Sequence, residues 1–208
     1  MSTQEISLQY SIRFPRLPFL LINIIGHIGT GKTTLAFYLW RRWKWVTLSK
    51  YVGNIYFQYD RSKVSEFWEA IKNYKKERAW VVVDDISFAI GQKDREFLHT
   101  LTKLRHFNPR VKRWVVVTIM HYSRATLPFL RQAGVKILTS LTDPEEIEAL
   151  RWSFTTSALW DYYRVYTECP ECHYILVNWM GKIGISHFNK PKRNTCWEIV
   201  VNGNPCVG

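Results

Sequence analysis

Residues 19–33 read FLLINIIGHIGTGKT, an apolar run that leads directly into the motif G-x-x-x-x-G-K-[ST]. The motif spans Gly26 to Thr33 and matches at every fixed position. The apolar run predicts a buried β-strand before the motif, and the pattern LAFYL at 35–39 predicts a helix after it. A glycine-rich turn between a strand and a helix is the signature of a phosphate-binding loop.

This loop is suited to a triphosphate and a divalent cation. Successive backbone N–H groups converge on phosphate oxygens, and the following helix directs its positive end at the anion. Lys32 is expected to reach the β- and γ-phosphates, and Thr33 to hold Mg²⁺ through its hydroxyl. The expected ligands are ATP, or another nucleoside triphosphate, and Mg²⁺. The predicted nucleotide-binding residues are Gly26, Ile28, Gly29, Thr30, Gly31, Lys32, Thr33 and Thr34.

A second chemical motif occupies residues 79–85, where AWVVVDD is a continuous apolar run that ends in two acids. Such a run is typical of a parallel strand buried on both faces. Because ligands bind beyond the carboxyl ends of parallel strands, we expect Asp84 to hold Mg²⁺ with Thr33. Asp85 would orient or deprotonate the attacking water, so Lys32 and Asp85 are the predicted catalytic residues. The alternative is an acid pair that only caps the next helix.

The order of apolar and amphipathic segments indicates an α/β fold. Helical patterns separate the expected strands, which span 19–25, 51–59, 79–84, 114–119 and 135–140. Right-handed crossovers make this a mostly parallel, helix-covered sheet of the P-loop NTPase class. Cysteines and short strand-like runs concentrate near the C-terminus. We therefore predict an ATPase core over residues 1–166 and a small β-rich appendage over 167–208.

Two residues near the end of the 114–119 strand are candidates for sensing the γ-phosphate. Thr118 and His121 are polar groups that leave the expected sheet at its functional edge. An ordinary strand-end threonine and a loop histidine are equally good interpretations of these positions.

The charge balance points to an anionic partner. The 208-residue chain has a formal net charge of +12 and a pI near 9.6, which favours nucleic acid through electrostatic steering and counterion release. A generally basic surface or an anionic membrane is the alternative. Candidate DNA-facing segments are 110–113, 190–193 and the basic face of a helix expected over 62–78. No apolar run approaches the roughly 20 residues of a membrane span, and no signal peptide is evident, so an intracellular location is expected.

Three motifs together resemble the FtsK/HerA branch of P-loop ATPases. They are the phosphate-binding loop, the run Val81–Asp85, and the block Thr118–Tyr122 followed by Leu127–Arg131. The likeness is greatest to the genome-packaging ATPases of double-stranded DNA viruses with internal membranes, especially the archaeal turreted icosahedral viruses. It covers about 19–154.

The resemblance implies an ATP-hydrolysing motor that moves double-stranded DNA into a preformed capsid. It also implies a homo-oligomeric ring, expected to be a hexamer, with nucleotide between subunits and with capsid or portal-vertex proteins as partners. Such a motor would work in the host cytoplasm or at the packaging vertex of the virion. A neighbour's arginine would complete each site, and the candidates are Arg105, Arg124 and Arg131.

The chain departs from the family pattern at two points. Asp85 stands where related motors usually have glutamate, and Thr118 and His121 stand near the usual sensor glutamine. A P-loop ATPase that acts on a protein or membrane partner in assembly or secretion is the alternative function. A small-molecule nucleotide kinase also fits the size, but an arginine-rich acceptor lid is not evident.

The four cysteines lie in the last 40 residues of the chain. Cys169 and Cys172 have the C-x-x-C spacing of a zinc knuckle, and Cys196 and Cys206 could complete a tetrahedral zinc site. Disulfides are the main alternative, as in intracellular proteins of hyperthermophiles, and buried free thiols are the third.

Overall fold

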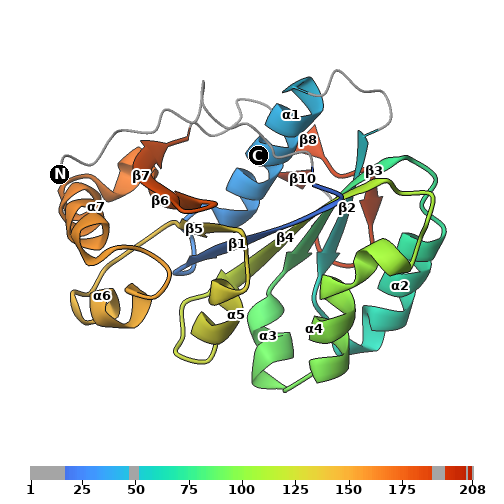
Figure 1. The fold of residues 1–208 in the computed structure, drawn as a ribbon, viewed down its shortest axis with the longest axis horizontal. Helices are drawn as coiled ribbons and strands as arrows, with labels where there is room; N and C mark the ends of the chain where they lie inside the picture. Colours follow the sequence, from blue (N-terminus) through green and yellow to red (C-terminus); the bar gives the residue numbers. More distant parts are fainter. Residues whose placement is uncertain (1–16, 47–51, 189–194, 205, 208) are drawn as a thin grey trace.

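A mixed sheet of eight strands organises the residues that the computed structural model describes, which are 17–46, 52–188, 195–204 and 206–207 (Figure 1). In spatial order the strands are β7 (Lys182–His187), β6 (Tyr174–Trp179), β5 (Val135–Leu138), β1 (Phe19–Gly26), β4 (Arg113–His121), β3 (Arg78–Asp84), β2 (Val52–Gln58) and β9 (Ile199–Val200). Six neighbouring strands are parallel, in the order β5, β1, β4, β3, β2 and β9. At the edge next to β5, β6 and β7 add antiparallel pairs. The predicted mostly parallel P-loop NTPase sheet is confirmed.

Helices cover both faces of this sheet (Figure 1). One face carries α1 (Lys32–Val46), whose apolar side chains share a buried cluster with β1, β3 and β4. The other face carries α2 (Val64–Lys72), α3 (Ile86–Gly91), α4 (Arg95–Thr102), α5 (Leu127–Arg131), α6 (Glu145–Leu150) and α7 (Thr156–Glu168). No helix in the described ranges is long and apolar enough to cross a membrane.

The register of the central strands brings their carboxyl ends to one edge of the sheet. Along β3, Val81 and Val83 face the α2–α7 layer while Trp80 and Val82 face α1, which explains why the run is apolar throughout. Gly26 at the end of β1 pairs with His121 of β4, and Gln58 at the end of β2 pairs with Asp84. The motifs predicted from separate stretches of sequence therefore end at one edge.

The strands after α7 extend the main sheet at both edges. The predicted boundary between residues 166 and 167 falls inside α7, while β6 pairs with β5 and β9 pairs with β2. Only β8 (Thr195–Cys196) and β10 (Cys206–Val207) form a separate two-stranded sheet within the described residues. The division into two units stays a prediction.

Disulfides take up all four cysteines. Cys169 is bonded to Cys172 in the short helix η3 (Pro170–Cys172), and Cys196 is bonded to Cys206 between β8 and β10. A disulfide sulfur lacks the thiolate charge that binds zinc, and the described residues contain no cluster of His, Cys, Asp and Glu placed to hold a metal. The zinc interpretation is therefore withdrawn in favour of the disulfide alternative.

Candidate functional site

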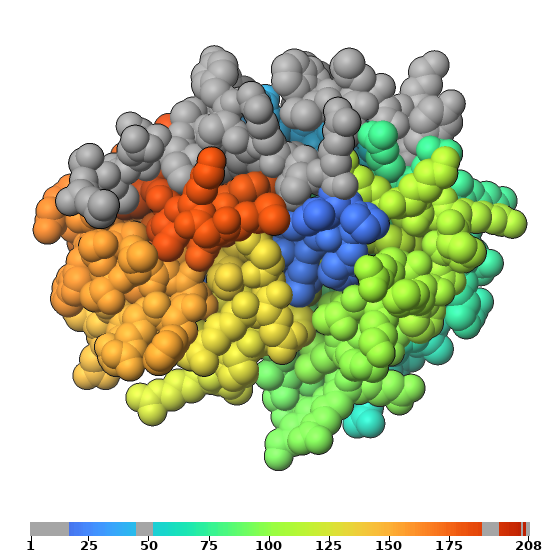
Figure 2. Space-filling view, in the orientation of Figure 1, coloured from blue at the N-terminus to red at the C-terminus, as the bar shows by residue number. Residues whose placement is uncertain are grey.

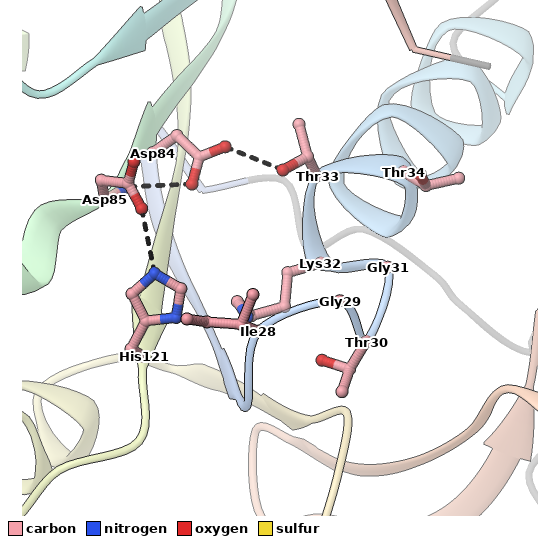
Figure 3. A pocket seen from close by; sticks show the side chains of 10 residues that line it. All are labelled: Ile28, Gly29, Thr30, Gly31, Lys32, Thr33, Thr34, Asp84, Asp85 and His121. Atoms are coloured by element: carbon pink, nitrogen blue, oxygen red, sulfur yellow. Dashed lines mark hydrogen bonds and ion pairs between the residues drawn. The ribbon is translucent and has the colours of Figure 1, made fainter. Parts of the chain in front are cut away.

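A pocket of about 510 Å³ opens where β1, β3 and β4 end (Figure 3). Its volume lies within the range typical of small-molecule sites. The residues that line it are Ile28, Gly29, Thr30, Gly31, Lys32, Thr33, Thr34, Asp84, Asp85 and His121. The structure thus brings the phosphate-binding loop and both predicted acids to one cavity.

The loop needs its glycines for two different reasons. Gly29 and Gly31 have φ of +82° and +77°, a left-handed conformation that side chains with a Cβ rarely adopt. Gly26, which does not line the pocket, has no room for a side chain, because a Cβ there would collide with the side chain of Thr139 just after β5. Residues with a Cβ would therefore strain the loop at Gly29 and Gly31 and collide with Thr139 at Gly26.

Lys32 is drawn back onto the loop. Its Nζ donates hydrogen bonds to the carbonyl oxygens of His27 at 2.6 Å and Gly26 at 3.0 Å, and the residue is only 6% exposed. Burial lowers the pKa of the ammonium group, and the carboxylates of Asp84 and Asp85 oppose that shift. Lys32 Nζ now donates to these two carbonyl oxygens. In the presence of a triphosphate it could donate to phosphate oxygens instead.

Asp84 is the buried acid of the pocket. Its Oδ2 accepts hydrogen bonds from Thr33 Oγ1 at 2.8 Å and Tyr56 OH at 2.9 Å. Burial raises the pKa of the Asp84 carboxyl group, and these two hydrogen bonds act in the opposite direction. A hydroxyl beside a carboxylate fits Mg²⁺, which binds oxygen ligands and takes most of its remaining ligands from phosphates and water.

Asp85 is clamped from two sides in a strained conformation. Its φ of 55° is left-handed, where it begins α3, and its Oδ2 accepts from Gln58 Nε2 at 2.8 Å. Its Oδ1 lies 3.1 Å from His121 Nε2 (Figure 3). A non-glycine residue with positive φ at a pocket is typical of functional sites, where the surroundings hold the strain in place.

The two sensor candidates end up in different places. Thr118 is fully buried, bonds to Asn23 Oδ1 at 2.5 Å inside the sheet, and does not line the pocket. His121 lines the pocket and contacts Asp85. Of the two, only His121 is placed to meet a ligand.

Three contacts at the site escaped the sequence analysis. Tyr56 and Gln58, two positions apart on β2, reach Asp84 and Asp85 respectively. His27, inside the loop motif, lies 3.1 Å from Glu146 of α6. The alternation along β2 could have suggested that Tyr56 and Gln58 share a face, but only the β2–β3 register brings that face to the acids.

The arginine candidates occupy different ends of the sheet. Arg105, in η2 (Leu104–His106), precedes β4, and Arg131 ends α5 before β5 with its guanidinium 5.8 Å from the ring of Trp152. Arg124 follows the carboxyl end of β4. Two residues before it, the ring of Tyr122 lies 5.8 Å from the ring of His27 in the phosphate-binding loop. All three are exposed, and none lines the pocket of its own chain. Among them, Arg124 belongs to the loop edge at which the pocket opens.

Removing the buried charge of Asp84 is expected to stabilise the empty protein. A carboxyl group with a raised pKa in the folded state disfavours folding once pH rises above its unfolded pKa of about 3.9. In Mg²⁺-free buffer, Asp84→Asn should therefore have a higher free energy of unfolding in urea than the parent at pH 7.5. The difference should shrink toward pH 4. Equal stability of the two proteins at pH 7.5 would contradict this expectation.

Comparisons with known proteins show the fold. No protein-family model matches the chain, and no curated protein matches its sequence. The DNA-packaging ATPase of Sulfolobus Turreted Icosahedral Virus has a TM-score of 0.54 at 15% identity, over 80% of this chain and 96% of that chain. The genome packaging NTPase of Sulfolobus turreted icosahedral virus 2, in complex with ATP-γS, has a TM-score of 0.56 at 14% identity, over 84% of this chain and 99% of that chain. The expected resemblance to packaging ATPases of turreted viruses is confirmed at the level of the fold.

Proposed function

We propose that the protein is a Mg²⁺-dependent ATPase that hydrolyses the β–γ phosphoanhydride bond to move double-stranded DNA into a viral capsid. The observation that carries the ATPase part is the placement of Lys32, Thr33, Asp84 and Asp85 around one pocket. The DNA part is supported by the fold shared with two viral packaging enzymes and by the net charge of +12.

Each group of the pocket has a role in this proposal. Backbone N–H groups of the loop bind the phosphates, and the ammonium group of Lys32 binds the β- and γ-phosphate oxygens. Thr33 and Asp84 hold Mg²⁺, which when bound neutralises charge on the phosphate oxygens. Asp85 orients the attacking water and accepts its proton, while His121 contacts the γ-phosphate end of the pocket.

The proposed assembly is a homo-oligomeric ring in which each site is completed by the next subunit. An arginine from the neighbour would stabilise the charge of the transferring phosphoryl group. The position of Arg124 at the pocket edge of the sheet favours it over Arg105 and Arg131. Such a ring would act in the host cytoplasm, at the packaging vertex, with capsid or portal-vertex proteins as partners.

The test of this function is hydrolysis in the presence of long duplex DNA. At low salt, DNA should raise the rate of phosphate release several-fold, and the stimulation should fade as salt rises because the contacts are to phosphates. A rate that DNA leaves unchanged at low salt would contradict the translocase. Stimulation by anionic vesicles instead would favour an ATPase that acts on a membrane or protein partner.

A further inference from the structure

The outer surface of α4 carries cations that form no ion pair with the acids of the described residues. Lys93, Arg95, Lys103 and Arg105 are exposed, and no ion pair in the described part of the chain involves any of them. With the exposed His99 they form what we call the α4 basic surface. Figure 1 shows α4 between α3 and α2 in the lower part of the view, and Figure 2 shows the same side of the molecule in space-filling form. The exposed acid of the helix, Glu96, lies in the first turn, where it suits the helix dipole.

The basic residues of α2 provide the contrast. Lys63 pairs with Glu66 at 2.7 Å, and Lys72 pairs with Glu69 at 2.9 Å. Lys76, after the helix, pairs with Glu198. The face that the sequence suggested as basic is thus largely neutralised within the chain, and the same holds for Lys112, which lies 2.9 Å from Glu77. The candidate segment 190–193 lies outside the described residues.

The spacing along α4 aligns three of these basic side chains. Arg95, His99 and Lys103 follow one another at four-residue intervals, while Phe97 and Leu101 of the same helix are buried in the core. Eight residues of helix span about 12 Å, so the row is about two turns long. Arg95 and Lys103 stand at the two ends of this row, and neither has an ion pair in the described part of the chain, so both are open to an anionic partner.

Duplex DNA is the polyanion that fits this row. It carries one phosphate charge per about 1.7 Å of axis, so a 12 Å row faces several phosphates on one surface of the duplex. Flexible lysine and arginine side chains contact phosphates without reading the sequence, as a motor that moves any DNA requires. The apolar face of α4 is buried in the core, so the helix cannot insert it into a lipid surface.

The same surface is joined directly to the nucleotide site. Asp85 is the N-cap residue of α3, and its carbonyl accepts a hydrogen bond from Phe88 N at 3.0 Å. At the other end of α3, the carbonyl of Ala89 accepts from Asp94 N at 2.9 Å, and the Asp94 carboxylate caps α4 by accepting from Phe97 N at 3.1 Å. A helix of six residues therefore separates the proposed catalytic acid from the basic row.

We propose that the α4 basic surface grips the phosphate backbone of double-stranded DNA, and that α3 couples this grip to Asp85. The inference rests on the proposed function, since it names the surface through which the motor holds its substrate. DNA contact and nucleotide turnover are then linked through one short helix within each subunit.

The test compares two double variants that each remove two exposed positive charges. Arg95→Gln with Lys103→Gln alters the α4 basic surface, and Arg164→Gln with Lys182→Gln alters α7 and β7 as the matched control. Binding of fluorescent duplex DNA is measured by anisotropy at several salt concentrations. The slope of log K against log salt should fall by nearly 2 in the α4 variant, since each lost phosphate contact removes about 0.9. The slope of the control should stay that of the parent.

Hydrolysis provides the second readout. The α4 variant should keep the basal ATPase rate and lose most of the stimulation by DNA, because its pocket is intact. Equal slopes in the two variants would overturn the assignment. So would an α4 variant that loses binding to phosphatidylglycerol vesicles but binds DNA as the parent does. Undiminished stimulation in an α4 variant that binds DNA weakly would overturn the coupling through α3. If the parent protein bound no duplex DNA, the proposed function itself would fail.

Discussion

Lys32→Ala is expected to abolish ATP hydrolysis, with a loss of at least about 10²–10³ in kcat, as for other preorganised charges at a reacting group. The Lys32 residue is 6% exposed, and its Nζ is held at the loop by two carbonyl oxygens, from which it can turn to a bound triphosphate. Alanine leaves the loop backbone able to form but removes the charge that faces the β- and γ-phosphates. Phosphate release under saturating Mg²⁺ and ATP measures the effect.

The matched control lies on the same helix. Lys44→Ala removes an exposed lysine in the last turn of α1, whose Nζ lies 5.0 Å from the ring centroid of Trp40 and away from the pocket. This variant should hydrolyse ATP at the parental rate, and thermal melting should show that both variants fold. Hydrolysis by Lys32→Ala at a rate near that of Lys44→Ala would remove Lys32 from the mechanism.

Asp85→Asn is expected to lower kcat by about 10²–10⁴ while nucleotide binding is kept, the range typical of a lost general base. Asparagine keeps an oxygen for the hydrogen bond from Gln58 and adopts left-handed backbone conformations readily, so it suits the φ of 55°. What it loses is the capacity to accept a proton from water. Single-turnover hydrolysis and equilibrium binding of a fluorescent ATP analogue separate the two effects.

A second substitution tests whether the carboxylate itself is needed. Asp85→Glu keeps a carboxylate but places it one methylene further out, on a residue less tolerant of positive φ. It should retain more activity than Asp85→Asn and less than the parent. An Asp85→Asn variant with full turnover would show that another group accepts the proton.

Local motifs in the sequence predicted the centre of the site because their spacing encodes a complete structural unit. The loop from Gly26 to Thr33 carries its strand, turn and helix start within fifteen residues, 19–33, and the run before Asp84 is apolar at every position. Since parallel strands end at one edge, these two motifs alone place Lys32 near Asp84. The structure brings both to one pocket.

The parts that sequence reasoning missed depend on contacts between distant strands. Gln58 reaches Asp85 only because β2 and β3 are in register, and Thr118 is buried because Asn23 of β1 lies opposite it. Likewise, β6 joins the main sheet by pairing with β5, a long-range contact that short strand-like runs do not encode. The helix expected over 62–78 is too long: α2 ends at Lys72 with Asn73 as its C-cap, and Arg78 already belongs to β3.

The most direct test of the nucleotide site is a crystal structure of the protein with Mg²⁺ and a non-hydrolysable ATP analogue. We expect the triphosphate to lie on the loop, with Lys32 Nζ moved from the carbonyl oxygens of Gly26 and His27 to the β- and γ-phosphates. Mg²⁺ should lie beside Thr33 and Asp84. An analogue bound elsewhere, or a bound triphosphate with Lys32 still on the loop carbonyls, would contradict the proposed site.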